Sequence, residues 1–162
     1  MKELQFDRRF VVLSVVLLCF FMIAYYAKGG VVSVIALLAN IFFIIGTLAS
    51  MGTVLTLPGI AGIVLTIGMA VDANVLINER VRDELKAGRT LKSAISTSYS
   101  NSGALSAILD SNLTTFITAV ILYIFGSGPI RGFATTLGLG ILTSLFTAIF
   151  ISRMVVERKL DK

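Results

Sequence analysis

Long apolar stretches dominate the pattern of hydrophobic and polar positions along this chain. Five of them lie at about 10–27, 31–51, 58–79, 104–126 and 131–152. Each is long enough to cross the roughly 30 Å hydrocarbon layer of a membrane as a helix, which takes about 20 residues. The pattern predicts an all-α membrane protein with five spanning helices, a polar stub at 1–9, a polar connector at 80–103 and a polar tail at 154–162.

Composition supports a membrane protein and limits its chemistry. Hydrophobic residues make up 56% of the 162 residues and charged residues only 14%, whereas soluble domains carry about 25% charged residues. The chain has no His and a single Cys, Cys19, inside the first apolar stretch. We therefore expect no disulfide framework, no metal site and no cofactor. Nucleotide-binding and hydrolase motifs are also missing from the sequence, so we do not expect an enzyme.

Lysine and arginine positions predict how the chain is oriented. If 80–103 is cytoplasmic, ten of the 14 basic residues lie on that side and four on the other. The four are Lys2, Arg8, Arg9 and Arg131. Because basic residues concentrate on the cytoplasmic side, we expect an extracytoplasmic N-terminus and a cytoplasmic C-terminus. The basic segments are then topology signals and contacts for anionic lipids, rather than nucleic-acid binding patches.

An extracytoplasmic, charged N-terminus before an odd number of spans is difficult to insert without an upstream helix. The first apolar stretch is too long for a signal peptide and lacks a cleavage site after it. We expect the chain to be the C-terminal part of a longer protein. The alternative is a complete small membrane protein whose first helix inserts with its N-terminus outside.

Asp72 is the most informative residue, because it lies inside the third apolar stretch. A charged side chain near the centre of a membrane helix costs roughly 2.5–3.5 kcal/mol. Such residues usually form a charge pathway or a proton site. The alternative is an inert carboxylate hydrated at the inner boundary. Helical spacing places four residues on its face, which we expect to meet protein rather than lipid: Ala61, Leu65, Gly68 and Glu79.

A second carboxylate, Asp110, begins a polar stripe in the fourth stretch. Ser106, Asp110, Thr114 and Thr118 follow one another at intervals of four, beside Asn112 and Thr115. Hydroxyl stripes often only form hydrogen bonds to neighbouring helices, and this is also the commoner explanation for a lone polar residue such as Asn40, near the middle of the second stretch. With the carboxylate present, a structural and a proton-path role are equally supported.

Glycines predict where helices approach closely. Small residues let membrane helices pack backbone to backbone, and we expect this at Gly62, Gly68, Gly132 and Gly140. In the connector we expect Gly88 to separate two short surface helices. The charged residues of that segment are expected to form mostly a solvated face, and a docking surface for a partner is the alternative.

Three strings in order resemble one family. They are GIAGIVLTIGMAVDANVLINERVRDELKAG, LSAILDSNLTT and FGSGPIRGFATTLGLGILTSLFTA. The sequence resembles the SecD/SecF family of the RND superfamily, and VDANVLINER followed by ILDSNLTT is closer to its SecD half. The resemblance covers almost the whole chain and is strongest from Thr56 to Arg153. Asn78, where an aromatic residue is common, and Gly103-Ala104, where bulkier or basic residues are frequent, depart from the family pattern.

The resemblance implies five of the six helices of an RND-type transmembrane bundle in the inner membrane. It also implies a subunit that uses the proton motive force to drive late steps of protein export. Asp72 would be the proton-path carboxylate, with Asp110, Asn112, Thr114 and Thr115 close to it. The implied partners are a SecF-like subunit, the Sec channel complex, membrane lipids and the secreted polypeptide. The polypeptide would be gripped by an extracytoplasmic domain that this sequence lacks.

Three other functions remain open from the sequence. Two carboxylates on separate membrane helices are also a feature of aspartyl intramembrane proteases, which need both carboxyls to share a proton. The Gly-x-Gly-Asp string of those enzymes is absent. A passive scaffold and an RND-family exporter of lipids or drugs are the other two possibilities.

Overall fold

The computed structural model describes residues 2–52, 55–100, 103–151, 153–154 and 157–158, with side chains from Arg9 onward. The described chain is helical and contains five helices of membrane-spanning length, as predicted. The helices are α1 (Lys2–Tyr26), α2 (Lys28–Ser50), α3 (Leu57–Lys86), α4 (Leu91–Ser98), α5 (Ala104–Phe125) and α6 (Pro129–Phe146), and a π-helical turn, η1 (Thr147–Ile151), continues α6.

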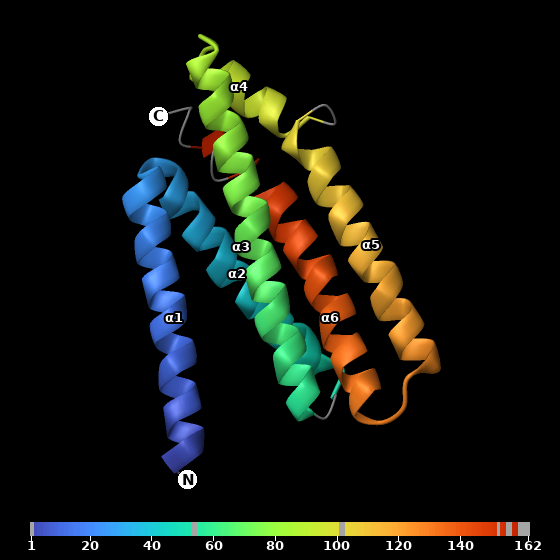
Figure 1. Ribbon diagram of the computed structural model, residues 1–162. Coiled ribbons are helices and arrows are strands. Elements are labelled where there is room, and N and C mark those ends of the chain that lie inside the picture. Colours follow the sequence, from blue (N-terminus) through green and yellow to red (C-terminus); the bar gives the residue numbers. More distant parts are fainter. Residues whose placement is uncertain (1, 53–54, 101–102, 152, 155–156, 159–162) are drawn as a thin grey trace.

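The α6 helix lies at the centre of the bundle and contacts α2, α3 and α5, whereas α1 lies at the edge against α2 (Figure 1). The α1–α2 corner, the short helix α4 and η1 lie at one end of the bundle. The α2–α3 and α5–α6 connections and the N-terminus lie at the other end (Figure 1). This grouping agrees with the predicted five-span topology. Below, the end that carries α4 is called the connector end.

The helix bounds differ from the predicted ones in two places. The turn expected at 28–30 is confined to Ala27, whose φ is 48°, and α2 already begins at Lys28. Gly30 sits in the first turn of α2, where any β-carbon would collide with the backbone of Met22. A close helix crossing, rather than a turn, therefore requires this glycine.

The third helix is longer than its apolar stretch. It continues through Lys86, so the first of the two surface helices expected in the connector is the end of α3. Gly88, with a φ of 85°, follows that end, and α4 begins at Leu91. The expected start of α3 is confirmed: Thr56 caps it by accepting a hydrogen bond from the backbone N–H of Gly59 at 3.1 Å, and Pro58 lies in its first turn. A turn was expected at Gly52-Thr53; Gly52 lies in a turn, and Thr53 lies outside the described residues.

Glycines and threonines interlock where α3 packs against α6. A β-carbon at Gly62 would collide with Thr136, one at Gly132 with Thr56, and one at Gly140 with Thr66. Each glycine therefore receives a threonine from the other helix, which lets the two backbones come close. The packing role predicted for these glycines agrees with this geometry.

Candidate functional site

Asp72 lies near the middle of the bundle along its long axis. Its neighbours Val71 and Asn74 line a small space with Leu37 of α2 and Leu18 of α1. Leu37 is nine residues beyond the start of α2, or about 14 Å along that helix at 1.5 Å per residue. A membrane about 30 Å thick would therefore place Asp72 close to its centre.

The Asp72 side chain is exposed on the surface of this chain. Its carboxylate forms no hydrogen bond or ion pair with any residue that the structure describes. The predicted common face of α3 is present, and Ala61, Leu65 and Gly68 are exposed along it. A side chain at Gly68 would meet no atom within 4 Å. Within this chain, then, the face is not packed, and the packing expected at Gly68 would have to come from another molecule.

Asp110 does not lie beside Asp72. Ile108 and Ala104 are the α5 residues that pack toward Ala73 and Ile77 of α3. Asp110 is two residues beyond Ile108, about 200° around the helix at 100° per residue, so its exposed side chain points away from α3. The two carboxylates therefore cannot share a proton in this structure, which removes the geometric basis of the aspartyl protease alternative.

The predicted polar neighbours divide between the two sides of α5. Asn112 is buried and donates to the backbone carbonyl of Ile108 at 2.7 Å. Thr115 is half-buried, and Thr114 is exposed. Both threonine hydroxyls donate to backbone carbonyls of their own helix: Thr115 to that of Ser111, and Thr114 to that of Asp110. These groups do not connect Asp110 to Asp72 through side-chain hydrogen bonds.

Buried polar residues lie behind the Asp72 face, in the interior of the bundle. Thr66 and Asn74 of α3 are buried, and both donate to carbonyls of their own helix. Thr147, at the start of η1, is also buried. Asn40 is 1% exposed, and neither its amide nitrogen nor its oxygen has a partner among the described residues. The interhelical hydrogen bond expected at Asn40 is therefore not formed with any described residue.

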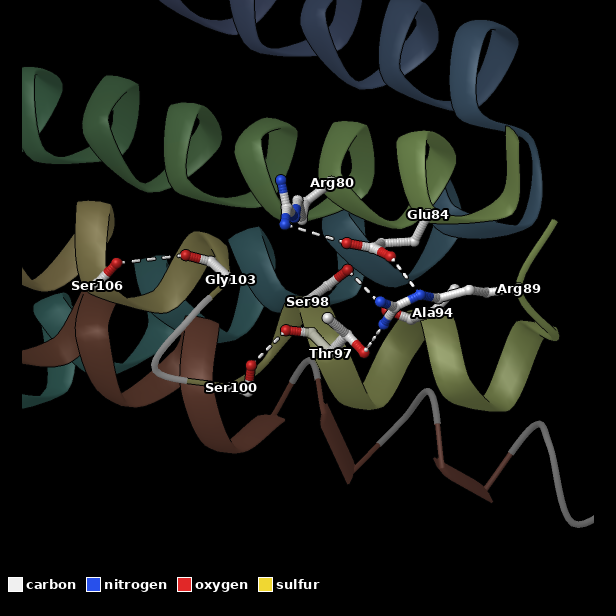
Figure 2. Close-up of polar contacts among 9 residues, drawn as sticks. All are labelled: Arg80, Glu84, Arg89, Ala94, Thr97, Ser98, Ser100, Gly103 and Ser106. Atoms are coloured by element: carbon white, nitrogen blue, oxygen red, sulfur yellow. Dashed lines mark hydrogen bonds and ion pairs between the residues drawn. The ribbon is translucent and has the colours of Figure 1, made fainter. Parts of the chain in front are cut away.

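The connector contains an ion-pair cluster that sequence reasoning missed (Figure 2). Glu84 is buried, and its two carboxylate oxygens lie 3.0 Å from Nη2 of Arg80 and 3.0 Å from Nε of Arg89. Arg89 also donates from Nη1 to the Thr97 hydroxyl of α4 at 2.9 Å. Glu84 is an exception to the mostly solvated charged face that was expected for the connector. The i, i+4 spacing of Arg80 and Glu84 was the available sequence signal.

The comparisons with known proteins decide the family. A family model described as protein export membrane protein SecD/SecF, C-terminal, matches residues 7–160. The chain belongs to this family. It is 58% identical over 157 residues to protein translocase subunit SecD of Rhodothermus marinus, and this match covers 94% of the chain and 25% of the relative. It is 51% identical over 138 residues to that of Salmonella choleraesuis, covering 85% of the chain and 22% of the relative.

Solved structures of the same family have the same fold. The crystal structure of SecDF from Thermus thermophilus, described as a translocon-associated membrane protein, superposes with a TM-score of 0.90 at 39% identity. The match covers 98% of this chain and 22% of that one. A second SecDF structure, in a super-membrane-facing form, gives a TM-score of 0.91. The bundle is thus the SecD-like, C-terminal transmembrane part of the family fold, and it spans about a quarter of the curated relatives' length.

Proposed function

We propose that this chain is the proton-responsive membrane bundle of a SecD-like subunit of the Sec export machinery. Asp72 binds and releases protons, and the proton gradient thereby drives late steps of polypeptide translocation without covalent chemistry. One observation carries the proposal: a carboxylate at mid-depth that is exposed and has no hydrogen-bond or ion-pair partner among the described residues. Facing lipid, the ionised form costs roughly 2.5–3.5 kcal/mol, and protonation removes that cost.

The energy available from one proton is sufficient for such a switch. A proton that crosses 100 mV releases roughly 2.3 kcal/mol, which changes a two-state equilibrium about 50-fold. The α3 helix that carries Asp72 also packs against α6 and ends in the Glu84 cluster at the connector end. Protonation at Asp72 would therefore act on one helix that contacts most of the bundle.

A SecF-like subunit is the proposed cover of the exposed Asp72 face, in complex with the Sec channel. A membrane helix does not leave a carboxylate against acyl chains when a protein partner is available. The secreted polypeptide would be bound by parts of the longer protein outside this chain. Retention of a SecF-like protein during purification in mild detergent is the expected result.

The bundle is proposed to lie in the inner membrane with its connector end in the cytoplasm. Ser96 on α4 and Ser127 in the α5–α6 connection are both exposed and lie at opposite ends. In a Cys19→Ser background, Ser127→Cys should react with an impermeant maleimide added from outside, and Ser96→Cys should not. Equal labelling of both from outside would contradict this orientation.

Asp72→Asn in the full-length protein tests the mechanism. Asparagine keeps the size of the side chain but cannot be ionised, so export should fall to the level measured without a proton gradient. Asp110→Asn removes a carboxylate that points away from α3 and should have a milder effect. Both are compared by the rate of protein export into inverted vesicles with and without a gradient. Export at the normal rate by Asp72→Asn would favour the passive scaffold.

A further inference from the structure

A cavity of about 520 Å³ opens at the connector end of the bundle, between the α1–α2 corner, α3 and α4. It lies outside the Asp72 face. Its large aliphatic lining residues come from three helices and are Val32, Ile77, Val81, Leu85, Leu91 and Ile95. Ligand sites commonly have volumes of about 300–1,000 Å³ and mostly apolar walls. The space is therefore large enough for part of an amphiphilic molecule.

The polar rim of this cavity is basic. Lys28 and Arg82 line it, and no carboxylate is among the described lining residues. Arg82 is held in place, because Nη1 donates to the Tyr25 hydroxyl at 2.9 Å and the guanidinium lies 5.1 Å from the centre of that ring. Glu79 lies beside the rim: its Oε1 is 3.7 Å from Nη1 of Arg82 and accepts a hydrogen bond from the Tyr26 hydroxyl at 2.8 Å. One carboxylate beside two cations leaves a positive rim.

The start of α2 adds to the positive rim. Lys28 and Gly29 both line the cavity, and α2 begins there with no side-chain cap and no acidic residue in its first turn. The first N–H groups of a helix have no partners within the helix and carry a partial positive charge. A bound anion would satisfy them together with the two side-chain cations.

The cavity also lies at the depth of lipid headgroups. The membrane-spanning part of α1 ends at Tyr26, and α2 begins two residues later. Tyr25 and Tyr26 form the kind of aromatic pair that gathers at membrane interfaces. The basic rim is therefore at the boundary, and the apolar wall formed by Val81, Ile77 and Val32 extends from it toward the membrane centre.

We propose that this cavity binds an anionic glycerophospholipid of the cytoplasmic leaflet. Its phosphate would lie between Lys28, Arg82 and the N–H of Gly29, with an acyl chain running past Val81 and Ile77 toward the membrane centre. This ligand carries a negative charge and a hydrocarbon chain on one molecule, which matches a basic rim above an apolar wall. Basic pockets between membrane helices on the cytoplasmic side bind such headgroups.

Native mass spectrometry of the delipidated chain in mild detergent tests the proposal. Dioleoylphosphatidylglycerol should bind at least tenfold more tightly than dioleoylphosphatidylcholine. Since each cation near an anionic lipid contributes roughly fivefold, Lys28→Gln with Arg82→Gln should weaken phosphatidylglycerol binding about 25-fold. The matched control is Lys86→Gln with Lys92→Gln, which removes two exposed cations that do not line the cavity. It should change binding by less than twofold.

Val81→Phe separates the acyl-chain site from the headgroup site. The variant keeps both cations but fills the apolar wall, so binding should fall at least tenfold. If the double variant does not fold, as judged by circular dichroism and gel filtration, Val81→Phe and Lys28→Gln alone decide the question. Equal losses in the control pair, unchanged binding by Val81→Phe, or full competition by glycerol phosphate would each overturn the proposal.

Discussion

Two carboxylates on α3 have opposite environments. Glu84 is buried between Arg80 and Arg89, whereas Asp72 is exposed and has no partner among the described residues. They are 12 residues apart, or about 18 Å along the helix. One charge is therefore compensated inside the chain, and the other is left for a proton or a second molecule.

The position of each residue along the helix explains the difference. At the connector end, arginine side chains reach water, and those of Arg80 and Arg89 are 44% and 50% exposed. At mid-depth an added arginine would cost about as much as the aspartate itself. A fixed cation there would also keep the carboxylate ionised and prevent a switch by protonation. An unpaired Asp72 therefore suits a proton site, and a paired Glu84 suits a rigid joint between α3 and α4.

The largest expected effect on stability concerns the Glu84 cluster. Arg80→Gln with Arg89→Gln leaves a buried carboxylate unpaired, which costs up to about 3–5 kcal/mol. Glu84→Gln should cost less, because the two arginines left behind are half exposed and become hydrated. The free energy of unfolding in mixed micelles, obtained by titration with dodecyl sulfate, measures both.

The order of these two losses is the informative result. If Glu84→Gln were more destabilising than the double arginine variant, relief of an unpaired buried charge would not be the main contribution of the two arginines to stability. A matched exposed pair provides the baseline: Lys86 and Asp83 are 3.9 Å apart with both side chains more than half exposed. Lys86→Gln should change stability by less than about 1 kcal/mol.

The bundle was predictable from the sequence because its signals are long and local. Composition and helical spacing alone predict the five apolar stretches and the close helix packing at Gly62, Gly132 and Gly140. The end of α3 was not predictable by the same reasoning. Residues 80–86 are mostly polar but continue the helix. Glu84 is paired with Arg89 only after the chain turns at Gly88, and this pairing cannot be read from helical spacing.

The Asp72 site was only partly predictable. The spacing of Leu65, Gly68 and Asp72 correctly placed them on one face, yet burial of that face cannot be read from one chain's periodicity. The same limit applies to α5, where the family resemblance implied that Asp110 lies close to Asp72. Which side of α5 meets α3 is set by Ala104 and Ile108, whose packing partners lie in other helices.

The next largest difference in stability is expected between alanine substitutions at two glycines, Gly140 and Gly68. Gly140→Ala places a methyl group against Thr66, and overpacking of this kind costs about 1–3 kcal/mol. Gly68→Ala enters open space on the Asp72 face and should not destabilise the chain. Thermal unfolding of the purified chain compares the two. Loss of a co-purifying SecF-like partner in Gly68→Ala alone would show that this face is an interface.

The smallest expected effect on stability belongs to Asp72 itself. Its side chain is exposed and has no hydrogen bond or ion pair with the described residues, so Asp72→Asn should change the free energy of unfolding of the purified chain by less than about 0.5 kcal/mol. The same substitution is expected to abolish proton-driven export. Measuring both the free energy of unfolding and export for each variant would therefore distinguish the roles of the two carboxylates. Changes at the Glu84 cluster should lower stability, whereas Asp72→Asn should lower export alone. A loss of more than about 1 kcal/mol in Asp72→Asn would mean that the carboxylate supports the fold, and the contrast with Glu84 would disappear.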